Sequence, residues 1–174
     1  PGEDRQIIPS PKVSTYDQKP EMSAPEIAKN VLKVVEEDKY DFIAINFANA
    51  DMVGHSGLME PTVKAVETID KYLGQIADLI LAKGGAVVIT ADHGNAEELV
   101  NLQTGEVDKE HSNNPVPLLI IGREWEGQKG VGGDPLGGDL SLIQPVGLLS
   151  DVAPTVLKIM GIPQPPEMTG RPLI

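Results

Sequence analysis

Short and nearly continuous apolar runs occur at three places in the chain, at residues 42–47, 86–90 and 118–121. Runs of this length without regular polar alternation are typical of strands that are buried on both faces of a sheet. We therefore expect three buried strands. A further short strand is expected near residues 13–16, within a polar and proline-rich stretch.

Apolar residues spaced by three or four positions predict helices between these runs. The first helix should span about residues 24–38, with Ser23 as its N-cap and Glu26 completing a capping box. Further helices are expected over about residues 61–83 and 151–160. The stripe of the long second helix that we expect to be buried comprises Val63, Val66, Ile69, Leu73, Ile76 and Ile80.

The alternation of helices with buried strands predicts an α/β fold, with an open, mostly parallel sheet flanked by helices. Ligands of such sheets bind beyond the carboxyl ends of the strands. Residues 1–22 should form an irregular N-terminal segment, and the start at Pro1 suggests a part of a longer polypeptide. We interpret the glycine-rich residues 130–139 as a flexible connection without a phosphate-binding role.

Charge and composition exclude several classes of function. The 174 residues include 26 acidic and 14 basic side chains, which gives a net charge of −12. We expect no nucleic-acid partner, because nucleic-acid binding requires a basic surface. We also expect no membrane partner, since no apolar run approaches the length of a membrane span. The chain has no cysteine, so thiolate ligands are excluded and a cytoplasmic location is expected.

The three histidines stand out because all of them lie near the ends of apolar runs. Two follow an aspartate just beyond a predicted strand, and the third precedes the last predicted strand. The five candidate metal ligands are Asp51, His55, Asp92, His93 and His111. Asp51 and His55 are four positions apart and can share one face of a helical turn. Carboxylate and imidazole donors suit Mn²⁺, Zn²⁺ or Fe better than Ca²⁺.

Other interpretations of these residues are less favoured. A single Asp-His pair after a strand is more often a hydrogen-bonded turn than a metal site, but two such pairs and a third histidine favour metal. A Ser-His-Asp triad that uses Ser56 or Ser112 is disfavoured, because the chain lacks a Gly-x-Ser-x-Gly elbow. A site with two ions roughly 4 Å apart would clamp a phosphoryl group.

Longer motifs resemble the cofactor-independent (2,3-bisphosphoglycerate-independent) phosphoglycerate mutases of the alkaline phosphatase superfamily. The motifs with most specificity are NADMVGHSG at 49–57, TADHGNAE at 90–97 and HSNNPVP at 111–117. The resemblance covers essentially the whole chain. Further matching segments lie at residues 10–13, 20–24 and 161–170.

The resemblance implies a centre with two Mn²⁺ ions, or other divalent ions such as Zn²⁺ or Co²⁺. Asp51, His55 and His111 would bind one ion, and Asp92 and His93 would bind the other. The family supplies a further aspartate and the nucleophilic serine from an N-terminal segment that no part of this chain matches. We therefore expect no catalytic nucleophile within these 174 residues.

The resemblance also implies an alkaline-phosphatase-like fold in which residues 23–174 form the C-terminal part of the metal-binding phosphatase domain, without the substrate-binding domain. The full-length protein would be a monomeric isomerase of glycolysis that interconverts 3-phosphoglycerate and 2-phosphoglycerate through a phosphoserine. The chain alone should be inactive. Two alternatives stay open: another phosphotransferase of the superfamily, such as a phosphopentomutase, and a non-catalytic metal-binding module.

Overall fold

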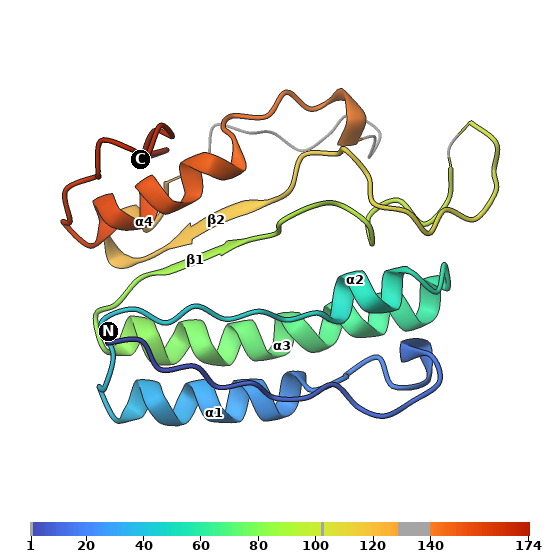
Figure 1. Ribbon diagram of the computed structural model, residues 1–174, viewed down its shortest axis with the longest axis horizontal. Helices are drawn as coiled ribbons and strands as arrows, with labels where there is room; N and C mark the ends of the chain where they lie inside the picture. Colours follow the sequence, from blue (N-terminus) through green and yellow to red (C-terminus); the bar gives the residue numbers. More distant parts are fainter. Residues whose placement is uncertain (1, 102, 129–139) are drawn as a thin grey trace. The chain divides into compact units, whose positions relative to one another are not determined.

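The computed structural model describes residues 2–101, 103–128 and 140–174 and divides the chain into two compact units (Figure 1). Unit 1 comprises Pro1–Lys83 and Gly94–Ser112, and unit 2 comprises Gly84–His93 and Asn113–Ile174. Each unit is described by itself below. The glycine-rich residues 130–139 lie outside the described residues.

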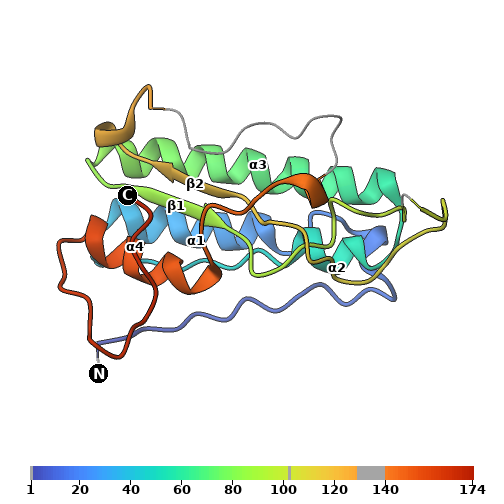
Figure 2. The same ribbon diagram turned by 90° about the horizontal axis from the view of Figure 1, so that it is seen from above.

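Three helices form the frame of unit 1: α1 (Ala24–Glu36), α2 (Asn49–Gly54) and α3 (Met59–Ala82). The two longer helices lie side by side, and the segment that leaves α1 runs back along them to α2 (Figures 1 and 2). The helices predicted over 24–38 and 61–83 are thus confirmed. Although α3 has 24 residues, no helix in the described part of the chain is both long and apolar enough to cross a membrane.

The main core of unit 1 lies between α1 and α3. Ala28, Val31 and Val35 of α1 pack with Ile76 of α3, and all four side chains are buried. Partly buried side chains of the segment between α1 and α2 complete this cluster: Ile43, Ile45 and Phe47. Burial of these aliphatic groups, rather than helix propensity alone, is what holds the two helices together.

The predicted strand at 42–47 is wrong, because the residues are extended but belong to no sheet in the described part of the chain. Alternate side chains of this segment face the helices, whereas Phe42, Ala44 and Asn46 are exposed. An extended segment becomes a strand only when a neighbouring backbone accepts its hydrogen bonds. The short strand expected near 13–16 is also wrong, since a 3₁₀ turn, η1 (Tyr16–Gln18), begins there.

The buried face of α3 differs from the predicted apolar stripe in its first half. Thr62, Ala65 and Thr68 are buried there, whereas Val63 and Val66 are 47% and 46% exposed. The threonines tolerate burial because each hydroxyl donates to the carbonyl four residues earlier, at 2.9 and 2.8 Å. Small residues on this face let α2 approach α3 closely.

Ser23 is the N-cap of α1 as predicted, but the predicted capping box does not form. The Ser23 hydroxyl donates instead to the carbonyl of Pro9 at 2.7 Å. This bond ties the N-terminal segment to the start of α1. A contact with a distant backbone group therefore replaces the local cap that the sequence spacing predicted.

Unit 2 contains two strands, β1 (Val87–Thr90) and β2 (Leu118–Ile121), at the predicted positions. They pair antiparallel, with Val87 opposite Ile121, so the predicted open, mostly parallel sheet is not found among the described residues. Parallel neighbours require a crossover connection, usually a helix. The described residues between the strands contain no helix, and the chain returns antiparallel.

Among its described residues, unit 2 also has short 3₁₀ turns and the predicted last helix. These elements are η2 (Arg123–Trp125), η4 (Leu140–Leu142), η5 (Leu149–Asp151) and α4 (Val152–Ile159). The helix lies alongside the two strands (Figures 1 and 2).

Asp151 fixes the start of α4 and the C-terminal tail. The Asp151 side chain is buried and accepts the backbone N–H groups of Leu148 at 2.9 Å and of Arg171 at 2.8 Å. Its backbone carbonyl accepts the Thr155 hydroxyl, which in turn accepts the N–H of Leu173 at 3.0 Å. The bonds from Leu148 and then Arg171 hold the pKa of the Asp151 carboxyl below its ordinary value.

The lowered pKa of Asp151 predicts that the stability of the protein falls at acid pH. Because the folded-state pKa lies below the unfolded value of about 3.9, the carboxylate contributes stability above that pH and loses it as pH falls toward the folded-state pKa. In Asp151→Asn, the side-chain amide nitrogen faces one of the two backbone N–H groups that the carboxylate accepted, and two donors cannot form a hydrogen bond. We expect the midpoint of thermal unfolding to fall by roughly 5 °C at neutral pH.

Circular dichroism melts of the two proteins between neutral pH and about pH 3 test this prediction, and the difference in midpoint should shrink in the acid range. Asp78→Asn, on an exposed position of α3, is the matched control and should change little. A difference for Asp151→Asn that stays constant with pH would contradict the assignment.

Candidate metal centre

Helix α2 carries Asp51, and His55 follows its last residue as the C-cap. The helix is anchored on its opposite face. Val53 is fully buried and packs with Met22 and with Ala65 of α3. The buried Asn49 begins the helix, and its Nδ2 donates to the Pro20 carbonyl at 2.8 Å. These contacts fix the orientation of a helix that is too short to be stable by itself.

Three nitrogen and oxygen atoms converge beside α2. The atoms Asp51 Oδ1, His55 Nε2 and His111 Nε2 are each 3.2 Å from the other two. The side chains of Asp51, His55 and His111 are 33%, 40% and 48% exposed, so solvent reaches this cluster. The predicted pairing of Asp51 with His55 on one helical face is confirmed, and the structure adds His111 to it.

A backbone acceptor determines which His55 nitrogen faces the cluster. His55 Nδ1 lies 2.6 Å from the carbonyl oxygen of Lys109. A carbonyl can only accept, so Nδ1 carries the hydrogen and Nε2 of the neutral ring presents its lone pair. Metal-bound histidines are commonly oriented by such a bond from the other ring nitrogen.

The spacing of the three donor atoms fits a divalent ion. Ligands at adjacent positions around an ion with bonds of about 2.1 Å are roughly 3 Å apart. Lone pairs held 3.2 Å apart repel one another unless a cation or a proton lies between them. A carboxylate with two imidazoles is a donor set for Mn²⁺, Zn²⁺ or Co²⁺. These residues therefore fit a metal ion, and the solvent-exposed side leaves room for other ligands.

The loop from Gly94 to Ser112 delivers His111 to the cluster. Its two ends meet in an antiparallel bridge between these residues, and the carboxylate of Glu97 accepts both the N–H of Asn95, at 2.7 Å, and the Ser112 hydroxyl. The buried Leu99 anchors the loop. This arrangement holds the backbone on both sides of His111.

The loop contains a small hairpin about residues 104–105. Val100 and Val107 form an antiparallel bridge, and Gly105 has a φ of 72° at the turn. Glycine adopts this left-handed conformation without the steric cost of a side chain.

Sequence reasoning missed two residues that support the centre, Asn95 and Glu97. Asn95 is buried, and its Nδ2 donates to Asp51 Oδ1 at 3.2 Å. Both residues lie in a polar, turn-rich stretch without periodicity. The available signal was their position within the motif at 90–97, two and four residues after His93.

Asp92 and His93 belong to unit 2, where they directly follow β1 as predicted. Asp92 Oδ2 and His93 Nε2 are 3.6 Å apart, and the Asp92 side chain is 90% exposed. The structure thus brings three of the five predicted ligands together in unit 1 and places the other two side by side in unit 2. Metal binding by all five stays a prediction.

The two serines of the alternative triad have other contacts. Ser56 Oγ accepts the N–H of Leu58 at 3.2 Å, in the turn before α3. The Ser112 hydroxyl donates to Glu97, as described above. These contacts give both serines a role in the local backbone geometry and agree with the preference for a metal centre over a triad.

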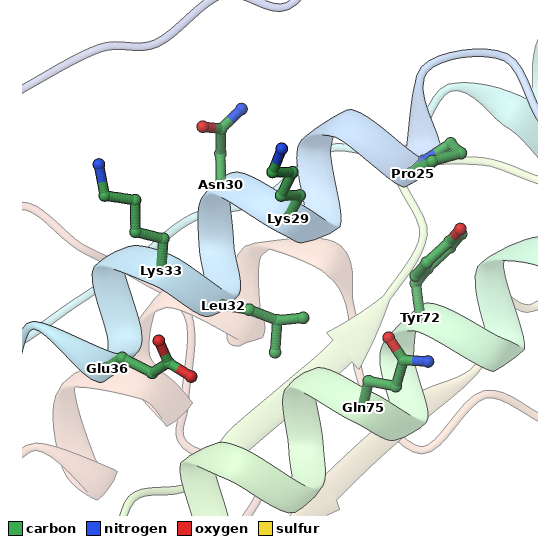
Figure 3. A pocket seen from close by; sticks show the side chains of 8 residues that line it. All are labelled: Pro25, Lys29, Asn30, Leu32, Lys33, Glu36, Tyr72 and Gln75. Carbon is green, nitrogen blue, oxygen red and sulfur yellow. The ribbon is translucent and has the colours of Figure 1, made fainter.

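A separate shallow groove of about 440 Å³ lies between α1 and α3 (Figure 3). Leu32 and Glu36 on α1 face Tyr72 and Gln75 on α3 across it, whereas Lys33 points away. None of the five predicted ligands lines this groove. This groove and the convergent donors are therefore at different places, and the chemistry that the residues support lies with the donors.

Comparison with known proteins identifies the family. The family model described as "Metalloenzyme superfamily" matches residues 1–164. The chain belongs to this superfamily. The resemblance to a metal-dependent family that the motifs indicated is thereby confirmed.

The curated relatives with high similarity are 2,3-bisphosphoglycerate-independent phosphoglycerate mutases. The protein from Symbiobacterium thermophilum is 48% identical over 174 residues, which are 100% of this chain and 31% of that protein. The protein from Clostridioides difficile is 50% identical over 173 residues, which are 99% and 31% of the two chains. The chain thus spans about a third of the length of the curated relatives that it matches, in their C-terminal part.

A solved structure of Leishmania mexicana phosphoglycerate mutase, determined at low cobalt concentration, is also similar. It shares 27% sequence identity with a TM-score of 0.74, and the match covers 95% of this chain and 30% of that one. A similar fold therefore occurs within that longer phosphoglycerate mutase.

The Glu97 carboxylate, which accepts hydrogen bonds from both ends of the loop, leads to a prediction. Glu97→Ala removes the acceptor of the Asn95 N–H and of the Ser112 hydroxyl. We expect amide exchange at the two ends of the loop to become roughly tenfold faster or more, because a charge-assisted hydrogen bond is lost there.

Hydrogen-exchange mass spectrometry of peptides covering 94–97 and 111–113 measures this change. Glu106→Ala, in the exposed hairpin of the same loop, is the control and should leave these peptides unchanged. Equal exchange in the Glu97 variant and the parent protein would show that Glu97 does not hold the loop.

Proposed function

We propose that this chain is the C-terminal part of a 2,3-bisphosphoglycerate-independent phosphoglycerate mutase, which interconverts 3-phosphoglycerate and 2-phosphoglycerate. The observation that carries the proposal is the convergence of Asp51, His55 and His111 within a chain that is 48–50% identical to such enzymes. In this proposal residues 23–174 belong to the metal-binding phosphatase domain, and the larger parallel sheet would be completed in the longer protein.

The proposed centre holds two Mn²⁺ ions. Asp51, His55 and His111 would hold one ion, and Asp92 and His93 would supply ligands to the other. The similar Leishmania mexicana enzyme was crystallised with cobalt, which supports a divalent transition metal at this centre. When bound, such ions neutralise charge on phosphoryl oxygens.

The residues of this chain contribute positioning to that chemistry. The Lys109 carbonyl keeps the His55 ring in one orientation, so the lone pair of its Nε2 can bind a metal ion without prior rotation of the ring. The anchoring of α2 by Val53 holds Asp51 in place at the same time. Fixing several groups before the substrate arrives lowers the entropic part of the barrier. The phosphate-accepting serine is proposed to lie outside these 174 residues.

An assay of the full-length protein tests the function directly. Purified protein, free of host mutase and loaded with Mn²⁺, is supplied with 3-phosphoglycerate, and the 2-phosphoglycerate formed is coupled to enolase. We expect turnover of phosphoglycerates and none of phosphopentoses. Turnover of phosphopentoses alone would indicate a phosphopentomutase, and turnover of neither would favour a non-catalytic metal-binding module.

Variants of the five ligands test the proposed site. Asp51→Asn, His55→Ala, Asp92→Asn, His93→Ala and His111→Ala should each reduce kcat by at least about 100-fold, since even groups that only orient metal ligands cost 10- to 100-fold when removed. Ser56→Ala, next to His55 but engaged in a turn, should retain near-normal activity. Near-normal kcat in any two of the ligand variants would show that the site is misplaced.

A further inference from the structure

Asn95 differs from the candidate ligands around it because it is 4% exposed. Its Nδ2 lies 3.2 Å from Asp51 Oδ1 and 3.4 Å from His55 Nδ1. The side-chain amide must present nitrogen to Asp51, because its oxygen would face a carboxylate that can only accept. The backbone N–H of Asn95 is itself held by Glu97 at 2.7 Å.

The oxygen of the same amide has no hydrogen-bond partner, although it is buried. Such unsatisfied atoms are rare in folded proteins and call for an explanation. A hydrophobic side chain of similar size would avoid this cost. The hydrogen bond from the amide nitrogen to Asp51 is the favourable interaction that offsets this cost.

Gly54 provides the space in which this amide lies. A Cβ atom built on Gly54 would overlap Asn95 Oδ1 and would be 3.1 Å from its Cγ. Gly54 is the last residue of α2, and its φ is not among the positive values that favour glycine. Steric room for Asn95, rather than backbone conformation, thus requires glycine here.

We infer that Asn95 is a positioning residue that orients the Asp51 carboxylate toward the metal ion, and that glycine at position 54 admits it. This inference rests on the proposal that Asp51 binds metal. A neutral N–H donor fixes the carboxylate without adding a positive charge that would repel the cation. It also leaves the remaining lone pairs of Asp51 free for the ion.

Calorimetric titration of the metal-free, full-length protein with Mn²⁺ tests the inference. Asn95→Ala should weaken Mn²⁺ binding about 10- to 100-fold. Gly54→Ala should weaken it in the same direction, because its methyl group displaces the Asn95 amide. In the double variant, Gly54→Ala should cause no further loss, since no amide is left to displace.

Asn30→Ala is the matched control, because Asn30 is also an asparagine of unit 1 but its Nδ2 donates to the Glu26 carbonyl within α1 and not to a candidate ligand. It should leave Mn²⁺ affinity within about threefold of the parent, since no group that orients a ligand is removed. If Asn95→Ala does not fold, Asn95→Ser replaces it in the same cycle.

Several results would overturn the inference: parent-like affinity in Asn95→Ala, equal losses in Asn95→Ala and Asn30→Ala, or additive losses in the double variant. The proposed function is judged separately, by the enolase-coupled assay of the parent protein. In one outcome the single and double variants show the expected Mn²⁺ affinities, while the parent protein does not convert phosphoglycerates. That result would refute the function and support the role of Asn95. A parent protein that binds no Mn²⁺ would refute the inference about Asn95, and the coupled assay would still decide the function.

Discussion

The centre depends on holding three electron-rich atoms together against their mutual repulsion. Asp51 Oδ1, His55 Nε2 and His111 Nε2 are 3.2 Å apart, and without a cation or proton their lone pairs oppose one another. Contacts with neighbouring groups hold these three side chains in place. Burial of Val53 fixes α2, and the Lys109 carbonyl fixes the His55 ring from the side of the loop. The fold of unit 1 thus prepares a site whose repulsion a bound cation would relieve.

The sequence predicted the three longer helices, α1, α3 and α4, and the pairing of Asp51 with His55, because both follow from local periodicity. Four-residue spacing on α2 places the two side chains on one face whatever surrounds the helix. His111 enters through a loop whose path depends on the bridge between Gly94 and Ser112. A contact between residues so distant in sequence has no periodic signature, so the sequence could suggest His111 as a ligand only from its position before the strand predicted at 118–121 and from its neighbours in the motif.

The sheet was predicted less well, since a strand is defined by its partner as much as by its own residues. Residues 42–47 have the apolar content of a strand and are extended, yet only one face is covered, by the core of α1 and α3. Asn95 was missed for a related reason. Its value lies in a polar contact with Asp51 and in the space left by Gly54, and neither leaves a hydrophobic pattern.

The two sets of predicted ligands differ in how far the structure prepares them. His55 and Asp51 each have a partner that fixes them, a backbone carbonyl for the ring and a buried amide for the carboxylate. The Asp92 side chain is 90% exposed, so it must lose rotamer freedom when it binds an ion. Side chains that are already ordered before binding lose no conformational entropy when an ion binds. If the centre binds ions as proposed, the candidate site in unit 1 would take its ion first, and an ion at Asp92 and His93 would need additional ligands to offset the cost of ordering them.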